Sequence, residues 1–246
     1  MSWKDNFPKE NRYFETDDGI LYCGDCLDVM KTFPKESVDL VLTDPPYGVG
    51  SNETNGIDYT DNYFNVNEVS DLLFNLLKEN TRLFCFIAQK TLFQTIYDFD
   101  KQFDFHQILV WHKPNFAGGG KKVYDFTSSY EFILLFHKGK PVKLKNPRDI
   151  SNEYLSNSDV LKYTQPQSNF KKDKRYHIHQ KPLKLIEHLI LASTNENNLV
   201  LDPFIGSGTT AVVAEKLNRR WIGIEISPEY CEIAKQRILN LKGDKE

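Results

Sequence analysis

A short loop at residues 44–47 carries groups that suit chemistry on a planar amine. Asp44, Pro45, Pro46 and Tyr47 directly follow residues 38–43, whose β-branched and apolar side chains predict a buried strand. The two prolines end that strand, because proline has no N–H to give to a ladder. The Asp44 carboxylate and the Pro45 carbonyl could each accept one N–H of an exocyclic amine, and Tyr47 offers a ring for stacking. Taken alone, the loop is also compatible with a simple strand terminator.

A glycine-rich turn farther along the chain has the features of a nucleoside-cofactor site. Residues 199–202 predict a strand, and Gly206 and Gly208 lie in the turn that joins it to a helix. These glycines let the backbone pass close to a ligand, and Glu225, at the end of the next predicted strand, can accept hydrogen bonds from ribose hydroxyls. The same spacing fits the dinucleotide fingerprint, so the cofactor stays open at this point. A nicotinamide-dependent oxidoreductase is one alternative, although it leaves the loop at 44–47 unexplained.

The elements around these loops alternate between strand and helix, which predicts an α/β fold with a mostly parallel sheet and helices on both faces. Ligands bind outside the carboxyl ends of the strands in such sheets, and both loops follow a predicted strand. The predicted strands are 20–23, 38–43, 82–88, 106–112, 130–137, 198–202 and 220–226. The predicted helices are 25–31, 72–80, 91–99, 182–192, the second part of 206–217, and 228 to about 241.

Composition indicates a globular protein of the cytosol. The chain has 246 residues, of which 40% are hydrophobic and 26% charged, and this suits one large α/β domain or a core with a modest insertion. No apolar run approaches the roughly 20 residues that span a bilayer, and the polar start lacks the apolar region of a secretory signal. Four cysteines do not make a disulfide framework. Cys23 and Cys26 have redox-motif spacing, but we predict packing residues and no metal site, since zinc needs four ligands.

Charge is distributed unevenly along the chain. The net charge is −3, yet residues 138–184 contain 12 basic and only 4 acidic residues. This stretch predicts contact with a polyanion on one face of the protein, and a solvated lysine-rich loop explains the charge equally well. Residues 138–176 lack sustained periodicity, which favours an insertion or a small second domain.

In their order along the chain, these motifs resemble the DNA amino-methyltransferases that use S-adenosyl-L-methionine, in the class whose catalytic motif precedes the cofactor motif (β order). Residues 43–48 match the catalytic motif, and residues 202–208 match the cofactor loop. The resemblance places Asp25 at the cofactor's adenine ring, Lys181 at its methionine end and Glu225 at its ribose. It implies the following cofactor contacts: Asp25, Asp44, Lys181, Asp202, Phe204, Gly206, Ser207, Gly208, Thr209 and Glu225. Residues 111–115 and 130–136 are similar to the paired strands behind the target-base pocket.

The resemblance also implies a domain plan and partners. It predicts a Rossmann-like catalytic half at 1–137, a small basic target-recognition insertion at 138–176, and a cofactor-binding half at 177–246. Double-stranded DNA is the implied substrate. A small recognition region favours a homodimer that shares DNA contacts, and a cognate restriction endonuclease is a candidate partner. The implied DNA contacts are Lys171, Lys172, Lys174 and Arg175.

The acceptor implied by the resemblance is adenine N6. Asp44 resembles the adenine enzymes, whereas many enzymes that methylate cytosine N4 carry Ser at this position. Cytosine N4 is the nearest alternative, because the same machinery needs only an amine beside a ring nitrogen. RNA and a protein glutamine are further alternative acceptors. A DNA-binding module without catalysis is disfavoured by the intact Asp44.

Overall fold

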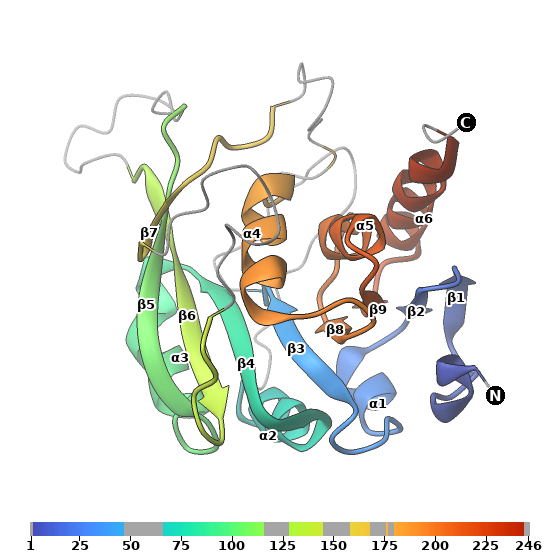
Figure 1. Ribbon diagram of the computed structural model, residues 1–246, viewed down its shortest axis with the longest axis horizontal. Helices are drawn as coiled ribbons and strands as arrows, with labels where there is room; N and C mark the ends of the chain where they lie inside the picture. Colours follow the sequence, from blue (N-terminus) through green and yellow to red (C-terminus); the bar gives the residue numbers. More distant parts are fainter. Residues whose placement is uncertain are drawn as a thin grey trace.

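The computed structural model describes residues 2–46, 66–115, 128–144, 158–167, 176 and 180–243. Within these residues the chain forms a nine-stranded sheet in the order β1-β2-β9-β8-β3-β4-β6-β5-β7 (Figure 1). The strands are β1 (Arg12–Glu15), β2 (Gly19–Cys23), β3 (Val38–Thr43), β4 (Leu77–Ile87), β5 (Asp104–His112), β6 (Tyr130–Lys138), β7 (Val160–Lys162), β8 (Leu199–Asp202) and β9 (Arg220–Glu225). The predicted α/β class is confirmed.

The strand order places a topological switch near the centre of the sheet. β2, β9, β8, β3 and β4 are parallel neighbours, whereas β1 and β6 run antiparallel to the strands beside them. The chain leaves β3 toward β4 and the strands beyond it on one side, whereas it leaves β8 toward β9 on the other side. Ligands bind at the carboxyl ends of the strands at such a point. The ends of β3 and β8, at Thr43 and Asp202, therefore mark the expected site.

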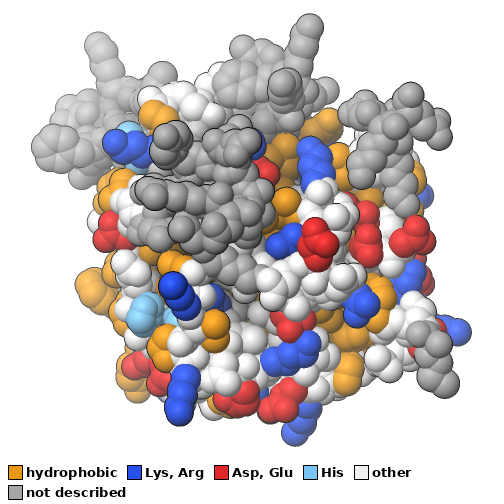
Figure 2. Space-filling view, viewed as in Figure 1, with side chains coloured by type: hydrophobic (Ala, Val, Ile, Leu, Met, Phe, Trp, Pro, Cys, Tyr) orange, Lys and Arg blue, Asp and Glu red, His pale blue; other side chains and the backbone are white. Residues whose placement is uncertain are grey.

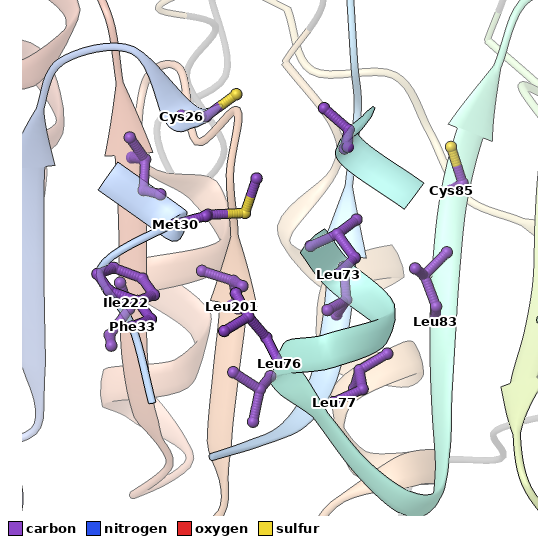
Figure 3. Close-up of a cluster of buried hydrophobic side chains, with 14 of the residues drawn as sticks. Cys26, Met30, Phe33, Leu73, Leu76, Leu77, Leu83, Cys85, Leu201 and Ile222 are labelled. Carbon is purple, nitrogen blue, oxygen red and sulfur yellow. The ribbon is translucent and has the colours of Figure 1, made fainter. Parts of the chain in front are cut away.

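Helices cover both faces of the sheet. The helices in the described residues are α1 (Cys26–Met30), α2 (Val66–Leu76), α3 (Leu92–Phe99), α4 (Leu183–Ser193), α5 (Thr209–Lys216) and α6 (Pro228–Gly243), with short 3₁₀ helices η1 (Trp3–Asn6) and η2 (Gln89–Thr91). α1, α2 and α3 pack on one face, and α4, α5 and α6 pack on the other (Figure 1). On the first face, Met30 and Leu73 belong to the same buried cluster as Leu201 and Ile222 of the sheet (Figure 3). Each fully buried side chain of this size contributes about 1.5–3 kcal/mol to stability.

One predicted helix is wrong at its carboxyl end. The sequence predicts a helix over 72–80, but α2 ends at Leu76 and β4 begins at Leu77. Leu77 pairs with Val38 in the parallel ladder between β3 and β4. Asn80 has a φ of 60°, a left-handed conformation that interrupts a right-handed helix. The ladder with β3 thus overrides the local helical periodicity.

Part of the predicted recognition insertion, 138–176, belongs to the sheet. The sequence does not predict β7, which lies inside this segment and pairs in parallel with β5. Lys138, the first residue of the basic stretch, ends β6, and its Nζ donates to the carbonyls of Phe74 and Leu77 at 3.0 and 2.8 Å. This lysine therefore stabilises the junction of α2 and β4 and is not part of an exposed basic surface.

The described surface carries charges of both signs. Figure 2 shows acidic and basic side chains interspersed over the lower part of one face, so neither sign of charge dominates there. None of the helices in the described ranges combines the length and apolar composition that a membrane span requires.

Candidate active site

Asp44 directly follows β3, one of the two strands at the topological switch. Pro45, which follows it, is buried, while the Asp44 side chain keeps 22% of its surface exposed. Lys181, just before α4, forms an ion pair with Asp44 through its Nζ and the Oδ2 atom. The Lys181 side chain is buried, and its Nζ lies 4.9 Å from the centre of the Phe86 ring. The fold thus joins two residues that are 137 positions apart in the chain.

Glu131 of β6, to which the sequence pattern assigns no role, extends this pair. Its Oε2 lies 3.4 Å from Lys181 Nζ, and its Oε1 lies 2.5 Å from the Nζ of Lys113. Burial opposes the charge of Lys181, but Asp44 and Glu131 raise the pKa of the ammonium above its ordinary value. Burial likewise opposes the charge of Glu131, but the two ammonium groups lower its pKa. A signal was present in the sequence: an acid at 131 interrupts an otherwise apolar strand pattern.

Asp202 ends β8 on the other side of the switch. Its buried carboxylate accepts hydrogen bonds from the Thr210 hydroxyl at 2.6 Å and from the Phe204 N–H at 3.1 Å. Burial raises the pKa of Asp202 to about 7, and the charges of Asp44 and Glu225 act in the same direction. A carboxylate held in this way becomes more easily ionised when a cation binds beside it.

This pKa predicts a pH-dependent stability that Asp202→Asn removes. Native Asp202 keeps its proton up to about pH 7, whereas the unfolded chain ionises near the ordinary value of 3.8. The native state therefore binds more protons in this window, and the free energy of unfolding falls as pH rises through it. Between pH 4 and pH 7.5, the free energy of unfolding of Asp202→Asn should rise by about 2–4 kcal/mol relative to that of wild type. Urea unfolding across this range measures the difference, and parallel stability curves for the two proteins would contradict it.

Glu225 ends β9, and the backbone around it fixes its carboxylate. Oε2 accepts the N–H of Gly206 and Oε1 accepts the N–H of Ser227, both at 2.9 Å. Burial raises the pKa of Glu225, and these backbone donors oppose the rise. Each carboxylate oxygen has a second lone pair, so the oriented group can still accept from a ligand hydroxyl. The glycine turn and the predicted ribose acid form one hydrogen-bonded unit.

The two glycines of the turn have different surroundings. Gly206 has a φ of 51°, and a Cβ atom there would meet nothing within 4 Å. Gly208 has a φ of 83°, and its Cβ would lie 2.8 Å from the Cβ of Ala234 on α6. Gly206 therefore borders open space that suits a ligand, whereas Gly208 permits the packing of the turn against α6.

Arg237 of α6, which the sequence pattern does not single out, fixes the glycine turn by hydrogen bonds. Its Nη1 donates to the carbonyl and the hydroxyl of Ser207 at 2.6 and 3.0 Å and to the hydroxyl of Thr209 at 3.2 Å. The side chains of Ser207 and Thr209, both predicted cofactor contacts, are thus engaged with α6. Because both hydroxyl oxygens accept from Arg237, each hydroxyl keeps its own O–H as a donor.

Asp25 has a structural role of its own at the start of α1. Its Oδ1 accepts the Leu27 N–H at 2.8 Å and so caps the helix. The N–H of Gly24 donates to the Glu225 carbonyl at 2.9 Å, which places Asp25 next to the end of β9. Burial raises the pKa of the Cys26 thiol to about 12, which suits a packing residue and not a reactive thiol.

Several predicted site residues lie outside the described residues and stay predictions. They are the stacking residue Tyr47 and the four DNA contacts Lys171, Lys172, Lys174 and Arg175.

The residues at this edge fit a nucleoside cofactor with positive charge. Asp44, Asp202 and Glu225 stand at the ends of three neighbouring parallel strands. Burial is the main cause of the raised pKa of Asp202, and repulsion by the charges of Asp44 and Glu225 adds to it. A bound cation would relieve that repulsion, and the open space at Gly206 leaves room for a ligand near the backbone. A Rossmann-like sheet with these groups at the carboxyl ends of its strands is typical of enzymes that bind a nucleoside cofactor.

The chain belongs to the N6_N4_Mtase family of DNA methylases, whose profile matches residues 38–236. The Type II methyltransferase M.HpaI of Haemophilus parainfluenzae is 30% identical over 243 residues, which span 90% of this chain and 74% of that protein. The M1.HpyAVI–SAM complex matches with a TM-score of 0.67 and 27% identity, over 88% of this chain and 98% of that one. The cytosine-N4-specific PvuII DNA methyltransferase matches with a TM-score of 0.74, over 93% of this chain and 89% of that one. At 23% identity, this likeness shows the shared fold. These matches confirm the resemblance to β-order amino-methyltransferases and do not support an oxidoreductase.

Proposed function

We propose that this chain is a site-specific DNA methyltransferase that transfers a methyl group from S-adenosyl-L-methionine to N6 of adenine in double-stranded DNA. The observation that carries the proposal is the position of Asp44. It lies at the topological switch, is oriented by Lys181, and stands next to the strand ends that carry Asp202 and Glu225. The family match supports the reaction class.

The cofactor would be held along the ends of β2, β9 and β8. Glu225, oriented by two backbone N–H groups, would accept the ribose hydroxyls, with Asp25 on the adenine side. Asp202 and Phe204, with the backbone of the turn at 206–209, would line the rest of the site. When bound, S-adenosylmethionine supplies a methyl group activated by its sulfonium.

The target base would be placed by the loop that begins at Asp44. An exocyclic amine is a weak nucleophile, because its lone pair is delocalised into the ring. The Asp44 carboxylate and the Pro45 carbonyl would each accept one N–H, which favours a pyramidal nitrogen, and Tyr47 would stack on the flipped base. The amine nitrogen forms the new C–N bond as the C–S bond breaks, and the nitrogen then releases one proton to solvent. Alignment of the two reactants is the main contribution.

The choice of adenine rests on Asp44, since many cytosine-N4 enzymes carry Ser at that position. The decisive experiment incubates the protein with DNA and labelled S-adenosylmethionine, digests the product to nucleosides, and identifies the modified one. N6-methyladenine supports the proposal. N4-methylcytosine would assign the alternative acceptor, and an absence of label in DNA would reject both.

We propose residues 1–137 and 177–246 as the two halves of the methyltransferase domain and 138–176 as the target-recognition insertion, in a cytoplasmic enzyme. The insertion is small, which favours a homodimer that shares DNA contacts. A cognate restriction endonuclease is a candidate partner, because the matched relatives include Type II methyltransferases.

Replacing Lys171, Lys172 and Lys174 with Ala is expected to weaken binding to all DNA sequences alike. Lysines on the DNA backbone displace condensed counterions, so log K falls with log salt by about 0.9 per phosphate contact. The triple variant should flatten this slope and keep methyl transfer at saturating DNA, because phosphate contacts position the protein without reading bases. Binding at several salt concentrations measures the slope.

A matched control replaces three exposed lysines elsewhere, Lys9, Lys35 and Lys216, with Ala. This control changes the net charge equally and should leave the slope close to that of wild type. An equal change in both triple variants, or an unchanged slope in the first, would place the DNA-binding surface elsewhere.

A further inference from the structure

Four charged side chains of alternating sign run from the end of β5 to the proposed catalytic carboxylate. Lys113 follows β5, Glu131 lies on β6, Lys181 precedes α4 and Asp44 follows β3. Lys113 Nζ lies 2.5 Å from Glu131 Oε1, Glu131 Oε2 lies 3.4 Å from Lys181 Nζ, and Lys181 is paired with Asp44. The register of β5 and β6 sets the first contact, since Trp111 pairs with Glu131 and the Lys113 N–H donates to the Ser129 carbonyl.

The two lysines have little freedom to move. Lys113 is 8% exposed and Lys181 is 6% exposed. Each ammonium also lies over an aromatic ring, Lys113 at 4.6 Å from the Trp111 ring centre and Lys181 at 4.9 Å from that of Phe86. A buried ammonium is held where carboxylates compensate its charge, so the place of Lys181 depends on both of its acidic partners.

We propose that Glu131 is a positioning residue for methyl transfer, and that it acts on Asp44 through Lys181. This inference rests on the proposed function. Glu131 shares the Lys181 ammonium with Asp44, which holds the lysine at one oxygen of Asp44 and limits how strongly it withdraws charge from that carboxylate. Lys113 anchors Glu131 from the other side. The target amine needs a carboxylate that is both fixed in direction and a strong acceptor, and this network supplies both properties.

Glu131→Gln tests the proposal, because it keeps the shape of the side chain and removes its charge. We expect kcat to fall about 10- to 100-fold, as when an outer partner that orients a reacting group is removed. The KM for S-adenosylmethionine and the KM for DNA should stay close to wild type, whereas the melting temperature should fall, because the variant removes a carboxylate beside the buried ammonium of Lys113. Glu131→Asp keeps the charge and should restore a large part of kcat.

The matched control is Glu187→Gln. Glu187 also pairs with a lysine, Lys184, at 3.1 Å, and its side chain is 31% exposed against 29% for Glu131. It lies on α4 outside the network, so its replacement should leave kcat unchanged. Lys113→Met alone should lower kcat. Added to Glu131→Gln it should have little further effect, because Lys113 acts through Glu131.

The outcomes separate this inference from the proposed function. An unchanged kcat in Glu131→Gln, beside a wild type that methylates DNA, would overturn the role of Glu131 and leave the function standing. A loss of kcat matched by an equal loss of cofactor affinity, or effects of Lys113→Met and Glu131→Gln that simply add, would also overturn it. If Glu131→Gln does not fold, Glu131→Asp and Lys113→Met carry the test with the same readouts. A wild type that transfers no methyl group would reject the function itself.

Discussion

Asp44→Ala is expected to lower kcat for methyl transfer to DNA by about 10²–10³-fold or more. The variant removes the carboxylate that would accept an N–H of the target amine, and it leaves Lys181 without its partner at the end of β3. Binding of S-adenosylmethionine should remain measurable, because Glu225 and the glycine turn are intact. Tritium transfer from labelled cofactor to DNA measures turnover, and calorimetry measures cofactor affinity.

Asp44→Asn serves as the control for shape. It keeps the size of the side chain and an acceptor oxygen, but it removes the charge that attracts Lys181. We expect it to be severely impaired as well, with a melting temperature closer to wild type than that of Asp44→Ala. A decrease of only a few-fold in kcat for either variant would refute the role assigned to Asp44.

Gly206→Val and Glu225→Ala are expected to weaken the binding of S-adenosylmethionine. A β-branched side chain is strained at a φ of 51° and would fill the open space beside Gly206, so this variant should lose binding almost completely. Glu225→Ala removes charge-assisted hydrogen bonds and should weaken the binding free energy of S-adenosylmethionine by about 1–3 kcal/mol, which is roughly 5- to 150-fold in Kd. Isothermal calorimetry on the folded variants measures both effects, and unaltered affinity in both would contradict the assigned site.

Gly208→Ala is the matched control within the same turn. The new Cβ would lie 2.8 Å from the Cβ of Ala234 on α6. The variant should therefore lower the free energy of unfolding, because α6 must shift to relieve this close contact. Glu225→Gln is the milder variant at the second position, because it keeps an acceptor for the N–H of Gly206 or Ser227. A loss of affinity in Gly208→Ala as large as that in Gly206→Val would mean that the turn acts only through the fold.

The sequence by itself determines the local features of this protein. Pro45 and Pro46 end the strand before them wherever that strand lies in the sheet, because proline lacks an N–H. The two glycines of the cofactor turn, Gly206 and Gly208, adopt positive φ values that favour glycine. The alternation of strands and helices predicts the mostly parallel sheet, since each pattern depends on side-chain periodicity over a few residues.

Only the tertiary structure decided which of these features meet. Lys181 and Asp44 are 137 positions apart, and nothing in their local spacing indicates that they pair with each other or that Glu131 joins them. The strand order brings them together, and strand order depends on contacts between distant segments. The same cause ends the predicted helix early at Leu76, where a long-range ladder outweighs a weak local propensity. Local chemistry is therefore readable from residue types, whereas the ion network that orients it exists only once the sheet has assembled.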